Sequence, residues 1–146
     1  MNIDVNIDTM AYKKKPVSVY IISTRISKNI ENISLEEFID RVGAQGTAFT
    51  RAILKGGRKN ENFQKQRLLV LDFDGTLSEK DFQKRCQEYN LSYLFLYRTF
   101  SWSREEHRFR AVFLIDRWLA TRELANVANL MLNKIFPEAD QACQDL

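Results

Sequence analysis

Two carboxylates, Asp72 and Asp74, interrupt an apolar run near the middle of the chain, in the stretch RLLVLDFDGTL over residues 67–77. A run this rich in Leu and Val predicts a buried strand, and alternation along a strand places both carboxylates on one face. Paired carboxylates at the end of a core strand repel each other, and a divalent cation would neutralise them. Carboxylate oxygens suit Mg²⁺ or Mn²⁺, so the pair predicts a metal site. The alternative is that one Asp is solvated at the strand end and the other caps the next helix.

Two arginines offer the complementary chemistry later in the chain. RFRAVFLI over residues 108–115 predicts a strand in which Arg108 and Arg110 share one face. Beside the acidic strand, they would form a site in which carboxylates hold a cation and guanidinium groups hold phosphate oxygens through forked hydrogen bonds. The alternative is a structural cluster of Asp–Arg salt bridges.

The elements around these residues predict why they would meet. After the acidic strand we expect a helix from Ser78 to about Tyr89, strands over 93–99 and 108–115, and a helix from Thr121 to about Phe136. This β-α-β-β-α order is five sixths of a βαββαβ ferredoxin-like unit, whose sixth element would follow Leu146. The first and third strands of such a unit are central antiparallel neighbours. The last helix has an apolar stripe that is expected to face the core, formed by Leu124, Val127, Ala128, Met131 and Ile135.

The first half of the chain gives weaker signals. Residues 1–16 are expected to form a loose arm, 17–23 a strand, and 47–54 another strand. A capping box at Ser34 and Glu37 predicts a helix that ends at Gly43. Residues 55–62 predict a basic loop whose glycine amides can approach phosphates, with a plain hairpin turn as the alternative. We therefore expect an arm over 1–16 and one domain over 17–146, with an N-terminal α/β part (17–66) and a ferredoxin-like part (67–146).

Composition excludes several classes of protein. The chain has 146 residues and a net charge of +3, which alone does not imply a nucleic-acid partner. Cys86 and Cys143 form no CxxC pair, so neither a disulfide framework nor a zinc site is expected, and this fits a reducing cytoplasm. No apolar stretch approaches the roughly 20 residues of a membrane span, and the N-terminus lacks signal-peptide features. We expect a cytoplasmic location and no membrane partner.

Two families have motifs that match around Asp72. DFDGTL alone resembles the first motif of haloacid dehalogenase-like phosphatases, which implies Asp72 as a nucleophile and Asp74 as an acid/base. The context argues against this reading. That motif normally opens its domain, whereas here about half the chain precedes it, and the rest follows a βαββα order in place of repeated βα units.

A longer resemblance starts near Gly46 and runs to the C-terminus. LKGGRKNENF, LLVLDFDGTLS, YLFLYRTFSWSREEHRFRAVFLID and IFPEADQACQD, in this order, resemble the primase-like replication proteins of plasmids, phages and integrated elements, in the archaeo-eukaryotic primase (primase-polymerase) superfamily. The resemblance implies an α+β fold, with a primase-like core and a ferredoxin/RRM-like βαββα(β) unit that lacks its last strand. It implies a metal-dependent nucleotidyltransferase. A non-catalytic nucleic-acid-binding replication-initiation module is the alternative.

The resemblance also implies roles for particular residues. Asp72 and Asp74 would bind Mg²⁺ or Mn²⁺, with Asp140 or Asp145 as the third acid. The nucleotide would be bound by Arg108, Arg110, Ser101 and His107, although the spacing around Ser101 departs from the family's Ser-x-His motif. Nucleic acid would be bound by Lys55, Arg58 and Lys59. The implied partners are single-stranded DNA or a primer-template, nucleoside triphosphates and a helicase.

Overall fold

The computed structural model describes residues 1–141 and divides into two compact units. Unit 1 comprises residues 1–67 and 117–125, and unit 2 comprises residues 68–116 and the described residues from 126 onward. Helices and antiparallel strands occur in both units, which confirms the α+β class. Within the described residues, no helix is long and apolar enough to cross a membrane.

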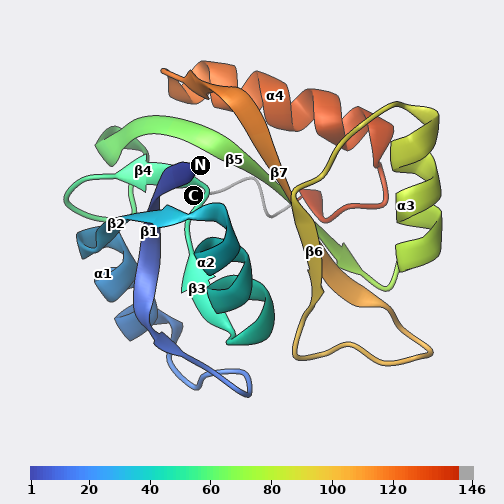
Figure 1. Ribbon diagram of the computed structural model, residues 1–146, viewed down its shortest axis with the longest axis horizontal. Coiled ribbons are helices and arrows are strands. Elements are labelled where there is room, and N and C mark those ends of the chain that lie inside the picture. Colours follow the sequence, from blue (N-terminus) through green and yellow to red (C-terminus); the bar gives the residue numbers. More distant parts are fainter. Residues whose placement is uncertain (142–146) are drawn as a thin grey trace. The chain divides into compact units, whose positions relative to one another are not determined.

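Unit 1 is built around the strand β1 (Asn2–Ala11), which lies in the middle of a three-stranded sheet with the order β2-β1-β3. The flanking strands are β2 (Ile30–Ser34) and β3 (Thr47–Phe49), and β2 pairs antiparallel with β1. The other elements of this part of the chain are α1 (Val19–Lys28), α2 (Leu35–Ile39), a π-helical turn (Asp40–Ala44), β4 (Ala52–Leu54) and a 3-10 turn (Asn60–Asn62). In Figure 1, β1 is the blue strand, with α1 beside it.

The N-terminal predictions were wrong in two places. Residues 2–11 form β1 and not a loose arm, and residues 17–23 lead into the helix α1 and not a strand. In α1, Ile22 and Ile26 are one turn apart and both buried, so packing outweighs the preference of β-branched residues for strands.

The other predictions for unit 1 were closer. The Ser34 cap is confirmed, because its Oγ accepts a hydrogen bond from the Glu37 backbone N–H at 3.1 Å. The helical turns run on past the expected end at Gly43 to Ala44. The predicted strand over 47–54 is present as β3 and β4, with a break at Thr50 and Arg51.

A four-stranded sheet has the order β4-β5-β7-β6. Its elements are β5 (Phe63–Asp74), β6 (Phe95–Arg98) and β7 (Arg108–Leu119), and the helices that accompany them are α3 (Glu79–Glu88) and α4 (Arg122–Ile135). The predicted β-α-β-β-α order is confirmed, and so are β5 and β7 as neighbours. The edge beside β5 was expected to lack a strand, but β4 pairs antiparallel with β5 there, Ala52 opposite Gln66.

The core of unit 2 lies between the sheet and the two helices. Alternate residues of β5 and β7 face α3 and α4, so Phe73 and Phe109 stack at 4.8 Å between ring centroids and meet Phe82 of α3 and Phe136 beyond α4. Each of these four phenylalanines is fully buried. The other face of β5 and β7 is mixed, because it carries the buried Leu68 and Val112 as well as the charged residues near the end of β5 and the start of β7.

The helix α4 was predicted correctly, but the apolar stripe expected to face this core was right only in part. Ala128 and Ile135 of that stripe pack against the core, whereas Leu124, Val127 and Met131 are exposed. Leu132, which was not in the expected stripe, is buried in the core.

Candidate active site

Two acid–arginine pairs cross from β5 to β7 in unit 2. The Asp72 Oδ2 atom lies 2.8 Å from Arg110 Nη2, and Asp74 Oδ1 lies 3.8 Å from Arg108 Nη1. The Gly75 N–H donates to the His107 carbonyl at 3.0 Å, one step further along the same antiparallel alignment. The structure therefore brings together the four residues that the sequence selected, on the face opposite the phenylalanine core.

The two pairs differ in burial. The Asp72 side chain is 13% exposed and the Arg110 side chain 38%, whereas the Asp74 side chain is 51% exposed. The Nε of Arg110 is buried and has no hydrogen-bond partner among the residues that the structure describes. The two pairs thus differ in the burial of their carboxylates, because the Arg108 side chain is 34% exposed, close to the 38% of Arg110.

Tyr97 of β6 is a further neighbour that the sequence did not indicate. Arg110 Nη1 donates to the Tyr97 hydroxyl at 3.4 Å. Burial raises the pKa of Tyr97, so this phenol stays protonated. Burial acts to lower the pKa of Arg110, but its interactions with Tyr97 and Asp72 outweigh this effect and raise it. Arg110 is therefore a permanent cation at this site.

Glu106 places a third carboxylate at the site. Its Oε2 lies 3.2 Å from Arg108 Nη2, so it shares Arg108 with Asp74. It also lies over Gly75, where a Cβ would come within 2.4 Å of its Cγ. Sequence reasoning missed Glu106 because a charge in REEHRFR looks like an ordinary solvated loop residue. The pairing of Gly75 with His107 is the feature that brings it close.

Of the two candidates for the third metal ligand, Asp140 and Asp145, the structure describes only Asp140. The Asp140 backbone N–H donates to the Asp72 carbonyl at 2.8 Å, which puts the chain after Pro137 beside β5. In residues 1–141, no three side chains of His, Cys, Asp or Glu gather in a way that could hold a metal ion. Asp145 lies outside the described residues.

His107 contacts the start of α3 and the ring of Trp102. Its Nδ1 accepts a hydrogen bond from the Glu79 backbone N–H at 3.4 Å, at the start of α3, and its ring lies 5.5 Å from that of Trp102. Ser101 is exposed in the same β6–β7 loop. The His107 contacts anchor the loop to the first turn of α3, and nucleotide binding by Ser101 and His107 stays a prediction.

Lys55, Arg58 and Lys59 belong to unit 1 and not to the unit that holds the acid–arginine pairs. They lie in the loop between β4 and β5, where Gly56 and Gly57 both have positive φ. Arg58 Nη1 donates to the Ser23 hydroxyl of α1 at 3.2 Å. The basic loop is therefore associated with α1.

Comparison of the chain with protein-family models, curated proteins and solved structures finds no match.

Proposed function

We propose that this protein is a metal-dependent nucleotidyltransferase of the primase-polymerase type that acts in the replication of a plasmid, phage or integrated element. The observation that carries the proposal is the pair of carboxylates on β5 facing two arginines on β7. Such a site combines ligands for a divalent cation with forked donors for phosphate. Its expected partners are nucleoside triphosphates, single-stranded DNA or a primer-template, and a helicase, in the cytoplasm.

The charges at the site favour a cation that accompanies the nucleotide. Three carboxylates (Asp72, Asp74 and Glu106) face two guanidinium groups (Arg108 and Arg110), which leaves the cluster one charge negative. A triphosphate alone would be repelled by this cluster. We therefore expect nucleotide binding to strengthen when Mg²⁺ or Mn²⁺ is present.

The donor set fits such an ion. Mg²⁺ is commonly held by one or two carboxylates together with water and substrate phosphates, so Asp72 and Asp74 would suffice without a third side chain. When bound, the ion would neutralise phosphate charge and lower the pKa of an attacking hydroxyl. Asp74 is the more exposed carboxylate and would meet the substrate together with Arg108, while Arg110 holds the carboxylate of Asp72 in place.

The non-catalytic alternative has an observation in its favour. Both aspartates are already paired with arginines, and the part of the chain from residue 1 to 141 has no three-ligand metal cluster. A replication-initiation module that binds nucleic acid without catalysis would keep these pairs as structural salt bridges. The phosphatase reading finds less support, because β5 pairs antiparallel with β4 and repeated βα units are absent from residues 67–141.

Primer extension separates the three functions. With Mn²⁺ or Mg²⁺, we expect template-dependent incorporation of labelled nucleotides, and its loss when Asp72 and Asp74 are both changed to Asn. Arg108→Ala should raise the KM for the nucleotide. DNA binding without incorporation would support the non-catalytic module. An aspartyl-phosphate, or its beryllofluoride mimic, at Asp72 would support the phosphatase.

A further inference from the structure

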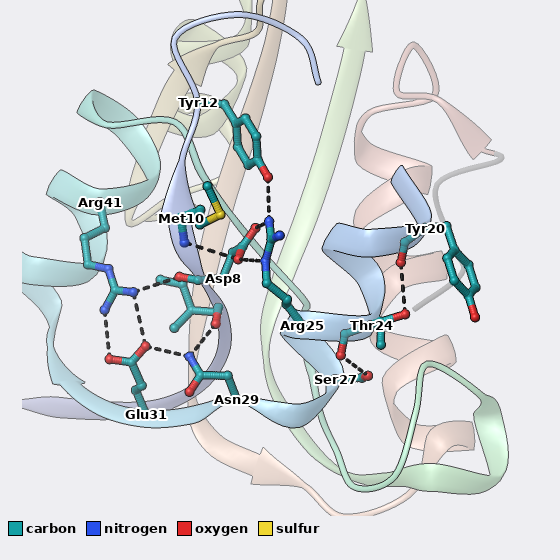
Figure 2. A network of polar contacts seen from close by, with 11 residues as sticks. Asp8, Met10, Tyr12, Tyr20, Thr24, Arg25, Ser27, Asn29, Glu31 and Arg41 are labelled. Carbon is teal, nitrogen blue, oxygen red and sulfur yellow. Dashed lines mark hydrogen bonds and ion pairs between the residues drawn. The ribbon is translucent and has the colours of Figure 1, made fainter. Parts of the chain in front are cut away.

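The first turns of α1 in unit 1 carry large side chains that are exposed among residues 1–141. Tyr20 is 81% exposed, and Val19 and Ile21 on either side of it are also exposed. The opposite face of the helix is buried through Ile22 and Ile26. Figure 2 shows the Tyr20 ring pointing away from the network around Asp8 and Arg25. The ring is thus free to meet a ligand and has no role in the core.

The surroundings of Tyr20 are basic. No Asp or Glu occurs between Thr9 and Ile30, whereas Lys13, Lys14 and Lys15 fall in this stretch and are exposed. Arg25 adds no net charge to this stretch, because the Asp8 carboxylate lies 2.8 Å from its guanidinium and neutralises it. The lysines give residues 9–30 a net positive charge, which favours an anionic partner.

A contact from a distant segment adds a forked donor beside the ring. Ser23 is three residues after Tyr20, so the two lie on one face of α1, about one turn apart. Arg58 donates to the Ser23 hydroxyl at 3.2 Å, and this contact places the guanidinium of the basic loop next to that face. The contact with Ser23 therefore brings the Arg58 guanidinium to within about one helical turn of Tyr20.

We propose that α1 and the 55–59 loop form a binding surface for single-stranded nucleic acid, with Tyr20 stacking on a base. Arg58 and Lys13–Lys15 contact the phosphates. Single-strand binders combine stacking aromatic residues with a basic track in this way. Because this surface would hold the template strand, the inference extends the proposed function.

The helix face favours nucleic acid over an anionic lipid surface. After Tyr20, this face continues with Ser23 and Thr24, which are half-buried, and the Thr24 Oγ1 donates to the Tyr20 carbonyl at 3.0 Å. Further along the helix, Ser27 is buried. A helix that inserts into lipid presents a continuous apolar face. One exposed aromatic ring followed by half-buried hydroxyl groups is not such a face.

The test is fluorescence anisotropy with a labelled oligothymidylate, without divalent metal or nucleotide. Stacking of a base contributes roughly 1–3 kcal/mol, so Tyr20→Ala should weaken binding about tenfold, whereas Tyr20→Trp should preserve it. Tyr89→Ala is the matched control, because Tyr89 is also exposed, at 57%, but lies in unit 2. Changing Lys13–Lys15 to Ala should reduce the salt dependence of log Kd by roughly 2, at about 0.7 per phosphate contact.

Further measurements separate this inference from the proposed function. The Asp72→Asn, Asp74→Asn variant should bind the oligonucleotide as the wild type does. Binding that depends on Tyr20, with no nucleotide incorporation, would refute the nucleotidyltransferase and leave this surface standing. Equal effects of Tyr20→Ala and Tyr89→Ala, with both variants folded by circular dichroism, would overturn the surface. So would binding of anionic vesicles that depends on Tyr20 when oligonucleotide binding does not.

Discussion

The two acid–arginine pairs should differ in energy, and a double-mutant cycle on each can measure the difference. Arg110→Met keeps the apolar stem and removes the cation, and Asp72→Asn keeps the shape and removes the anion. The partner pair, Asp74 with Arg108, is the matched control in the same pair of strands. The two cycles therefore compare Asp–Arg pairs that join the same two strands but whose carboxylates are buried to different extents.

The expected magnitudes follow from the burial and distance of each pair. Exposed ion pairs contribute about 0–1 kcal/mol, and breaking a buried pair costs about 3–5 kcal/mol. With Asp72 at 13% exposure, Arg110 at 38% and 2.8 Å between them, the first pair lies between these limits. We expect Arg110→Met to cost about 2 kcal/mol, roughly 8 °C in Tm at about 4 °C per kcal/mol, with a coupling energy of about 1.5 kcal/mol. The control pair should couple by less than about 0.5 kcal/mol.

The assay is urea unfolding followed by tryptophan fluorescence. Of the two tryptophans, Trp102 lies in unit 2 and Trp118 in unit 1, so a Trp118→Phe background reports on the unit that holds the site. Equal coupling in the two pairs would refute the reasoning from burial. A coupling near zero at Asp72 would mean that Arg110 is retained for a ligand and not for stability.

Three further outcomes follow from single residues. Gly75→Ala should destabilise the protein by about 1–2 kcal/mol in urea, because φ at this position is 81° and a Cβ would also collide with Glu106. Burial acts to raise the pKa of Asp8, but its hydrogen bonds with Arg25 and the backbone outweigh this effect and lower it. The stability from this pair should therefore be present above pH ~4 and be lost as pH falls through the native pKa, and Asp8→Asn should flatten acid unfolding monitored by circular dichroism. Burial raises the pKa of Cys86 to about 11, so in a variant with no other cysteine a thiol reagent should label it only as fast as the protein opens.

The sequence predicted unit 2 well because its signals are local. Alternation along β5 and β7 places the phenylalanines on one face and the Asp and Arg side chains on the other, and the β-α-β-β-α order makes the two strands neighbours. From these two facts the pairing of Asp72 and Asp74 with the arginines follows. Glu106 was beyond this reasoning, since its position depends on the path of a loop that no periodicity describes.

The sequence failed on β1 because polar residues in its core hide the strand signal. Asn6 is fully buried, where its amide donates to the Ile26 carbonyl at 2.9 Å and accepts from the Leu54 backbone N–H at 2.9 Å. Asp8 is also fully buried, next to Arg25. These partners lie far along the chain, so a local pattern reads NIDVNID as a polar arm when it is a core strand.

The helix α4 shows a different limit of sequence analysis. The helical spacing of its apolar residues was clear, but the side of the helix that faces the core was not. Leu124, Val127 and Met131 of the expected stripe are exposed, whereas Ala128 and Ile135 pack against the core beside Leu132. Phe136, just past the end of the helix, is fully buried against Phe82. The stripe was therefore only partly right, because a residue outside the helix helps to decide which side of it is buried.

We expect the two ion pairs to have different roles at the candidate site. Asp72 and Arg110 are partly buried, so an isolated charge on either would be costly, and they hold each other in place. Arg108 is shared between Asp74 and Glu106 at longer distances, so an incoming phosphate could replace a carboxylate there at little cost. If so, Glu106→Gln should strengthen nucleotide binding by removing a competing anion, while Arg108→Ala weakens it. A Glu106→Gln variant with unchanged affinity would show that phosphate does not reach Arg108, and would remove the arginine half of the proposed site.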